Sequence, residues 1–342
     1  MSIIYFGTNR NPRPKANPTN FGKQFSEDGL ANLRFGKAEV VGKSVTVKVH
    51  QEKLSQVPGV NQTDSGSSKL GSLALFDDLR KSMMRESSDT IVFIHGYNVS
   101  FKDALRAAAK IATNFAHLND GKGVNVVCFS WPSDGSMAPW LAYSSDRRDA
   151  AASGAALARG FLKLRDFIAS LSTDEACEQR LHLIAHSMGN YVLRHALQEV
   201  RRQSAHKLPR VFDQIFLMAA DEDDDAFEHD HKLRLLPRMA RHVNVYFNRG
   251  DTAMSVSDYT KGNPDRLGDD GPRGPFQVPG KVTQVDCSNV VDGLVEHSYY
   301  IDTPAVVADM AQVLEGVDPM KVDPREFLED RNRFVIKKGS GE

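Results

Sequence analysis

Four apolar segments of five residues recur along the chain, and each is followed by a stretch long enough for a helix. Uncharged interiors of this kind are typical of strands that are buried on both faces. Strands that alternate with helices form a parallel sheet with helices on both sides. We therefore predict an α/β fold with a mostly parallel, doubly wound sheet. The four segments are IVFIH (91–95), VVCFS (126–130), LHLIA (181–185) and IFLMA (215–219).

The remaining elements extend this pattern toward both ends of the chain. Short runs rich in β-branched residues predict strands, and apolar residues at helical spacing predict helices. The predicted strands lie at 3–6, 44–49, 90–95, 124–131, 180–185, 214–219, 242–247 and 282–287. The predicted helices lie at 72–84, 101–118, 148–171, 187–202, 226–239 and 303–314. Prolines and glycines predict loops near 12–22 and 54–70.

These elements fit a single domain that spans residues 1–342, because one α/β domain with insertions accommodates this length. We expect the N-terminal strands to be antiparallel additions to the parallel sheet. Two long loops, 131–147 and 252–280, are candidates for lids that cover a ligand site.

Composition narrows the classes of partner. The formal net charge is -1, so no overall field favours nucleic acid, and we expect no nucleic-acid partner. No run approaches 18 apolar residues, so we expect no membrane span, and residues 1–10 lack the pattern of a signal peptide. The three cysteines show no paired spacing, which indicates a reducing compartment and a cytoplasmic protein. No feature of the sequence indicates an oligomeric state.

The most informative stretch is LHLIAHSMGN, residues 181–190. Its sequence A-H-S-M-G is close to the Gly-x-Ser-x-Gly nucleophile elbow, in which a serine occupies a strained turn between a strand and a helix. Small residues two before and two after the serine let strand and helix approach closely, and Ala185 and Gly189 take these places. We therefore predict that Ser187 is a nucleophile. The short motif alone is common, and the alternative is a serine that only caps the following helix.

The turn after the strand at 90–95 is the predicted source of an oxyanion-hole donor. In this type of fold, one backbone N–H comes from such a turn and the other from the residue after the nucleophile. We predict these donors to be the backbone N–H groups of Tyr97 and Met188. A plain turn at His95-Gly96 is the alternative.

A nucleophilic serine needs a histidine base and a carboxylate that orients it, in the chain order Ser, Asp or Glu, His. Asp251 follows the strand at 242–247 and is the predicted acid, with Asp221 after the strand at 214–219 as its rival. His297 is the predicted base, because no other histidine follows Asp251.

Two further segments have alternative interpretations. Residues 221–230 contain seven acids, which we interpret as a solvated face at the start of a helix rather than a metal site; we expect no metal and no cofactor. Trp131, Met137 and Trp140 lie in a loop at the predicted crevice, where apolar side chains suit an acyl or alcohol group. We predict that they bind substrate, with local packing as the alternative.

In combination, several motifs resemble those of the bacterial α/β-hydrolase family of unknown function called DUF900. The resemblance covers about residues 3–300 and implies the hydrolase fold and a Ser–Asp–His triad, but little about the substrate. The motifs are YFGTNR (5–10), FIHGYN (93–98), FSWPS (129–133), LIAHSMGN (183–190) and NRGD (248–251) followed by S-x-S.

The predicted function is that of a serine hydrolase that cleaves carboxylic esters through an acyl-enzyme on Ser187. The expected partner is a small-molecule or polymeric ester, including lipid or aliphatic polyester substrates. An amidase, thioesterase or acyltransferase would use the same triad. The alternative from another class is a binding protein of the same fold without catalytic activity.

Overall fold

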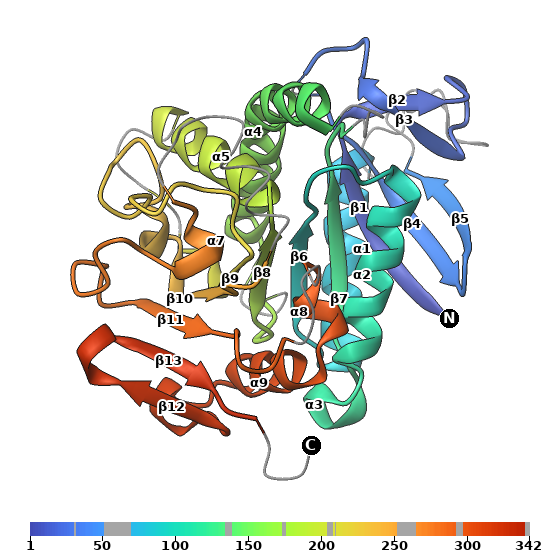
Figure 1. Ribbon diagram of the computed structural model, residues 1–342. Coiled ribbons are helices and arrows are strands. Elements are labelled where there is room, and N and C mark those ends of the chain that lie inside the picture. Colours follow the sequence, from blue (N-terminus) through green and yellow to red (C-terminus); the bar gives the residue numbers. More distant parts are fainter. Residues whose placement is uncertain are drawn as a thin grey trace.

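The computed structural model describes residues 1–30, 32–50, 70–133, 139–172, 176–203, 208, 210–251, 265–291 and 297–338, with residues 139–142 described in their backbone only. One large sheet runs through the molecule (Figure 1). It has eleven strands in the order β12-β13-β11-β10-β9-β8-β6-β7-β1-β4-β5, and β2 and β3 form a separate hairpin.

The strands of the large sheet are β1 (Ser2–Thr8), β4 (Arg34–Val41), β5 (Ser44–Val49), β6 (Thr90–Ile94), β7 (Asn125–Ser130), β8 (Leu181–His186), β9 (Phe212–Met218), β10 (Ala240–Phe247), β11 (Val282–Asp286), β12 (Arg325–Leu328) and β13 (Arg333–Ile336). The hairpin consists of β2 (Arg10–Arg13) and β3 (Asn20–Phe25). The helices are α1 (Gly71–Glu86), α2 (Phe101–Asn114), α3 (Leu118–Gly121), α4 (Pro139–Ala169), α5 (Gly189–Gln203), α7 (Leu267–Asp270), α8 (Tyr299–Asp302) and α9 (Pro304–Glu315). Short 3-10 helices are η3 (Leu236–Arg238), η4 (Pro319–Lys321) and η5 (Glu329–Arg331).

The predicted fold class is confirmed. Eight neighbouring strands, from β13 through β10 and β6 to β1, pair in parallel. At the N-terminal edge, β4 pairs antiparallel with β1, and β5 pairs antiparallel with β4. At the other edge, β12 pairs antiparallel with β13. The sheet is therefore mostly parallel, with an antiparallel part at the N-terminus as expected.

Separate apolar cores cover the two faces of the sheet. One core contains Leu75 of α1, Leu157 of α4 and Leu193 of α5. The other contains Phe101 of α2 and Met310 of α9. The strands between them have no polar face, which explains why β6 is buried at every position. This burial on both sides is the physical origin of the apolar segments in the sequence.

Several elements differ from the prediction. The stretch near 12–22, predicted to be a loop, contributes to the hairpin of β2 and β3, and β4, β12 and β13 were not predicted. Helix α4 begins at Pro139, so the second half of the candidate lid 131–147 is helical. The helix predicted at 226–239 is wrong: these residues form turns and the 3-10 helix η3. The described part of the other candidate lid, 265–280, contains α7 and packs beside β10.

Candidate active site

Ser187 lies in the turn between β8 and α5 and has a backbone φ of 51°. This left-handed conformation costs a non-glycine residue on the order of 1–2 kcal/mol, so the surrounding structure has to hold it in place. The Ser187 N–H donates to the Met218 carbonyl at the end of β9 (2.9 Å), and the Asn190 amide donates to the Ser187 carbonyl (3.0 Å). A strained serine after a parallel strand is the geometry that the sequence motif predicts.

Two glycines allow the chain to pack tightly around this turn. A Cβ atom on Gly189 would lie 2.6 Å from the Ile94 carbonyl oxygen and 2.7 Å from that of His95. A Cβ atom on Gly96 would lie 2.8 Å from the Ser187 Cβ. Neither position has room for a side chain, because the turn after β6 passes directly against the turn that carries Ser187.

Asp251 and His297 form a close pair. The Nδ1 atom of His297 lies 2.7 Å from an Asp251 carboxylate oxygen. The Asp251 side chain has no exposed surface, whereas the His297 side chain is 23% exposed. Because the carboxylate binds Nδ1, the ring proton lies on Nδ1 and Nε2 can accept a proton. This is the arrangement that a histidine base needs.

The same pair lies beside the residue that precedes Ser187. The rings of His186 and His297 are 4.7 Å apart between their centroids, and His186 Nε2 donates to the His297 carbonyl (3.0 Å). Burial and the neighbouring His297 lower the pKa of His186 well below its usual value, so His186 stays neutral in this role. Within the described part of the chain, the Ser187 hydroxyl makes no hydrogen bond to His297. Such catalytic hydrogen bonds often form fully only when substrate is bound.

The turn at residues 95–99 carries Tyr97, the first predicted oxyanion donor, and Gly96 of this turn contacts Ser187. The second, Met188, follows Ser187 directly, and its backbone N–H has no acceptor among the residues that the structure describes. His95 is fully buried, and burial together with Arg10 lowers its pKa to about 3. His95 is therefore a neutral structural residue rather than a base.

The apolar residues predicted to bind substrate have different outcomes. Trp131 has no exposed surface: its ring stacks on His95 and its indole N–H donates to the His95 carbonyl (2.8 Å). This placement contradicts its predicted role, because a buried indole supports the turn and offers no surface to a ligand. Met137 lies outside the described residues, as does the side chain of Trp140, so their roles stay predictions.

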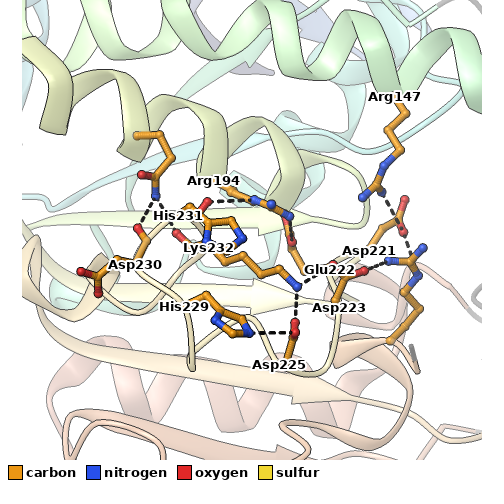
Figure 2. A network of polar contacts seen from close by, with 12 residues as sticks. Arg147, Arg194, Asp221, Glu222, Asp223, Asp225, His229, Asp230, His231 and Lys232 are labelled. Atoms are coloured by element: carbon orange, nitrogen blue, oxygen red, sulfur yellow. Dashed lines mark hydrogen bonds and ion pairs between the residues drawn. The ribbon is translucent and has the colours of Figure 1, made fainter. Parts of the chain in front are cut away.

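The acidic segment after β9 is a network of ion pairs, and its interpretation as a solvated face is wrong. Figure 2 shows the carboxylates of Asp221, Glu222, Asp223 and Asp225 directed toward cationic side chains from several elements. Lys232 Nζ lies 2.9 Å from an Asp223 oxygen and also contacts Asp225. Arg194 contacts the fully buried Glu222 at 3.1 Å. These ion pairs hold the segment in place without a helix. In the described parts of the chain, no three His, Cys, Asp or Glu side chains are arranged to hold a metal.

Asp221, the rival acid, belongs to this network. It accepts hydrogen bonds from the Tyr143 hydroxyl at 2.9 and 2.7 Å and lies 3.5 Å from the Arg266 guanidinium. Arg147 approaches it at 3.7 Å (Figure 2). The carboxylate in contact with His297 is that of Asp251, whereas Asp221 is occupied by these cations and the Tyr143 hydroxyl.

Glu222 provides a pH-dependent test of the network. Burial raises the pKa of Glu222 to about 7 from 4.5, and Arg194 only partly opposes this shift. The Glu222 carboxyl holds its proton more tightly in the folded protein than in the unfolded chain. Its contribution to the unfolding free energy is therefore complete below pH ~4.5 and is lost as the pH rises through ~7. Wild type should lose about 3 kcal/mol of unfolding free energy across this window relative to Glu222→Gln, as measured by urea denaturation at pH 4.5 and 8. The exposed Glu326→Gln should follow wild type; equal pH dependence in all three proteins would contradict the prediction.

Comparison with known proteins agrees with the fold. The chain belongs to the family described as "Alpha/beta hydrolase of unknown function (DUF900)", which matches residues 73–316 and confirms the resemblance. Among proteins of this kind, the "Uncharacterized protein alr1448" of Nostoc sp. (strain PCC 7120) is 23% identical, over 98% of this chain and all of the relative. No solved structure matches the chain significantly. Among the described residues, no helix is both long and apolar enough to span a membrane.

Proposed function

We propose that this protein is a serine hydrolase that cleaves carboxylic esters through an acyl-enzyme on Ser187. The observation that carries the proposal is the pairing of two features at one edge of the sheet. A serine held in a strained turn lies next to His186, and His186 contacts a histidine whose Nδ1 is bound by a buried carboxylate. The family to which the chain belongs is described as an α/β hydrolase, which supports a hydrolytic reaction.

In the first half of the reaction, His297 Nε2 takes the proton of the Ser187 hydroxyl while Oγ attacks the ester carbonyl carbon. The tetrahedral intermediate collapses with cleavage of the carbon–oxygen bond to the alcohol, which leaves with the proton from His297. Water then attacks the acyl-enzyme, gives one proton to His297, and releases the carboxylic acid. That proton returns to Ser187, so the enzyme is regenerated.

Asp251 accepts the hydrogen bond of His297 Nδ1–H throughout the cycle, which fixes the tautomer and stabilises the imidazolium. The oxyanion would receive hydrogen bonds from the backbone N–H groups of Tyr97 and Met188. The tight contact between the two turns at Gly96 and Ser187 supports this assignment, because Tyr97 and Met188 directly follow the two residues in contact.

The test is a panel of p-nitrophenyl esters of increasing acyl length, with matched amide and thioester substrates. We expect a burst of p-nitrophenolate equal to one equivalent of enzyme, followed by slower turnover, because an acyl-enzyme accumulates with activated esters. Preference for the amide or thioester would reassign the reaction to an amidase or thioesterase. Absence of turnover and of fluorophosphonate labelling would favour a binding protein instead.

A further inference from the structure

Arg10, the last residue of the YFGTNR motif, is a buried arginine at the start of the β2–β3 hairpin. Arg10 is 0% exposed to solvent. Burial of a guanidinium is costly unless hydrogen bonds replace its hydration. The positions of those bonds therefore indicate what the side chain supports.

The guanidinium contacts both ends of the turn that carries Tyr97. Its Nη2 donates to the Val99 carbonyl at 2.7 Å and lies 3.4 Å from Nε2 of His95. Its Nε donates to the hydroxyl of Ser130 (2.9 Å), the last residue of β7. Its Nη1 donates to the Gly22 carbonyl in β3 (3.2 Å). The planar guanidinium thus links the hairpin and β7 to both ends of the turn at 95–99.

The hydrogen bonds of His95 complete this link. Because arginine only donates, Nε2 of His95 has to accept, and the ring proton lies on Nδ1. Nδ1–H then donates to the Gly96 carbonyl (2.8 Å), and the Ser130 hydroxyl lies 3.3 Å from Nε2. A neutral His95 with this tautomer therefore fixes the peptide group between Gly96 and Tyr97, which contains the Tyr97 N–H.

The opposite side of the turn has longer contacts. The Asn98 N–H lies 3.5 Å from an Asp146 carboxylate oxygen, and the Val99 N–H lies 3.4 Å from the Ser133 hydroxyl. Asn98 has a φ of 55°, so the turn contains a strained residue that needs support. Of these three hydrogen bonds, the one from Arg10 to the Val99 carbonyl is the shortest, at 2.7 Å.

We infer that Arg10 is a positioning residue that fixes the turn at 95–99, so that the Tyr97 N–H is aimed at the oxyanion formed on attack by Ser187. The inference rests on the proposed function, since it assigns a task within the same site. It also gives a role to the N-terminal strands, which lie before the family match at residues 73–316. Only the planar fork of arginine reaches three elements at once, so lysine is not an equivalent replacement.

The test compares Arg10→Met and Arg10→Lys with Arg180→Met. Arg180 forms an ion pair with Asp89 at 2.9 Å, at the amino end of β8 and away from the site, so its loss controls for a removed cation. The readouts are the rate of Ser187 labelling by a fluorophosphonate, kcat and KM for p-nitrophenyl butyrate, and the inhibition constant of an aryl trifluoromethyl ketone. The ketone reports the oxyanion hole, because it forms a tetrahedral adduct on the serine.

We expect Arg10→Met to lower the labelling rate, kcat and ketone affinity by on the order of 10²-fold with KM near the wild-type value. Arg10→Lys should stay closer to Arg10→Met than to wild type, and Arg180→Met should keep wild-type values. If Arg10→Met does not fold, Ser130→Ala removes the hydroxyl that accepts from Arg10 Nε and lies near His95 Nε2, while the bonds of Arg10 to the Val99 and Gly22 carbonyls remain. This variant should lower the same three quantities a few-fold.

A loss of thermal stability with unchanged labelling rate and ketone affinity in Arg10→Met would overturn the inference. The two proposals fail separately. If wild type labels at Ser187 but hydrolyses no ester, the substrate assignment is wrong, while the labelling rates still decide the role of Arg10. If wild type is not labelled at all, both proposals are wrong.

Discussion

Ser187→Ala should abolish fluorophosphonate labelling and lower kcat for p-nitrophenyl esters by on the order of 10⁴–10⁶-fold. The reason is that Oγ is the atom that forms the acyl-enzyme in the proposed mechanism, and the methyl group of alanine cannot form that bond. The β8–α5 turn should remain folded, because its hydrogen bonds use the backbone of residue 187. The measurements are burst kinetics and mass spectrometry of the labelled protein.

A second buried serine provides the matched control for this variant. Ser88 is 2% exposed, lies at the amino end of β6, and accepts a hydrogen bond from the Asn125 amide (2.9 Å). Ser88→Ala should label and turn over like wild type, although it loses a hydrogen bond worth about 1 kcal/mol. Persistent labelling of Ser187→Ala would show that another residue is the nucleophile.

The parallel part of the fold could be predicted because its determinants are local. Strands buried on both faces require uninterrupted apolar residues, and this pattern is visible in segments such as 91–95 and 181–185. The antiparallel additions depend on pairing instead. In β4, Gly36 and charged residues interrupt the apolar pattern, and the strand is specified by its register with β1 and β5. A Cβ atom on Gly36 would meet Phe6 of β1 at 2.6 Å, which is a constraint that only the folded chain reveals.

The same distinction applies to the site. The order of Ser187, Asp251 and His297 along the chain was sufficient to nominate three residues, since the fold places each one after a strand at the same edge. The role that we infer for Arg10 could not be derived in this way, because its partners at Ser130, His95 and Val99 are far away in sequence. Trp131 was assigned to the crevice from its position in a loop, but its indole N–H finds its partner inside the protein.

Charge density misled the prediction at residues 221–230 for a related reason. Consecutive acids suggest exposure when their partners are unknown, and here the cations come from distant elements, such as Arg194 of α5 and Arg266 before α7. The contact between the Asp221 N–H and the Ser187 carbonyl (3.2 Å) joins this network to the elbow. The network therefore contacts the turn that carries Ser187 through the backbone of Asp221, whereas the carboxylate bound to His297 is that of Asp251.

Asp251→Asn and Asp221→Asn should have opposite effects on activity and stability. Asp251→Asn should lower kcat by on the order of 10⁴-fold, because an amide in place of the carboxylate favours the wrong His297 tautomer and cannot stabilise the imidazolium. Steady-state kinetics and fluorophosphonate labelling measure this effect. The Asp251→Asn variant should remain folded, since asparagine has nearly the same shape as aspartate.

Asp221→Asn should keep kcat within about tenfold of wild type, because its backbone N–H still reaches the Ser187 carbonyl. It should instead lower the unfolding free energy by about 3 kcal/mol, because the fully buried Arg266 loses the charge of Asp221, one of its carboxylate partners. Denaturation by urea gives this number, and the Asp251 variant serves as its reference. If Asp221→Asn removed activity while Asp251→Asn retained it, Asp221 would be the acid of the triad, and the 2.7 Å contact between Asp251 and His297 would have only a structural role.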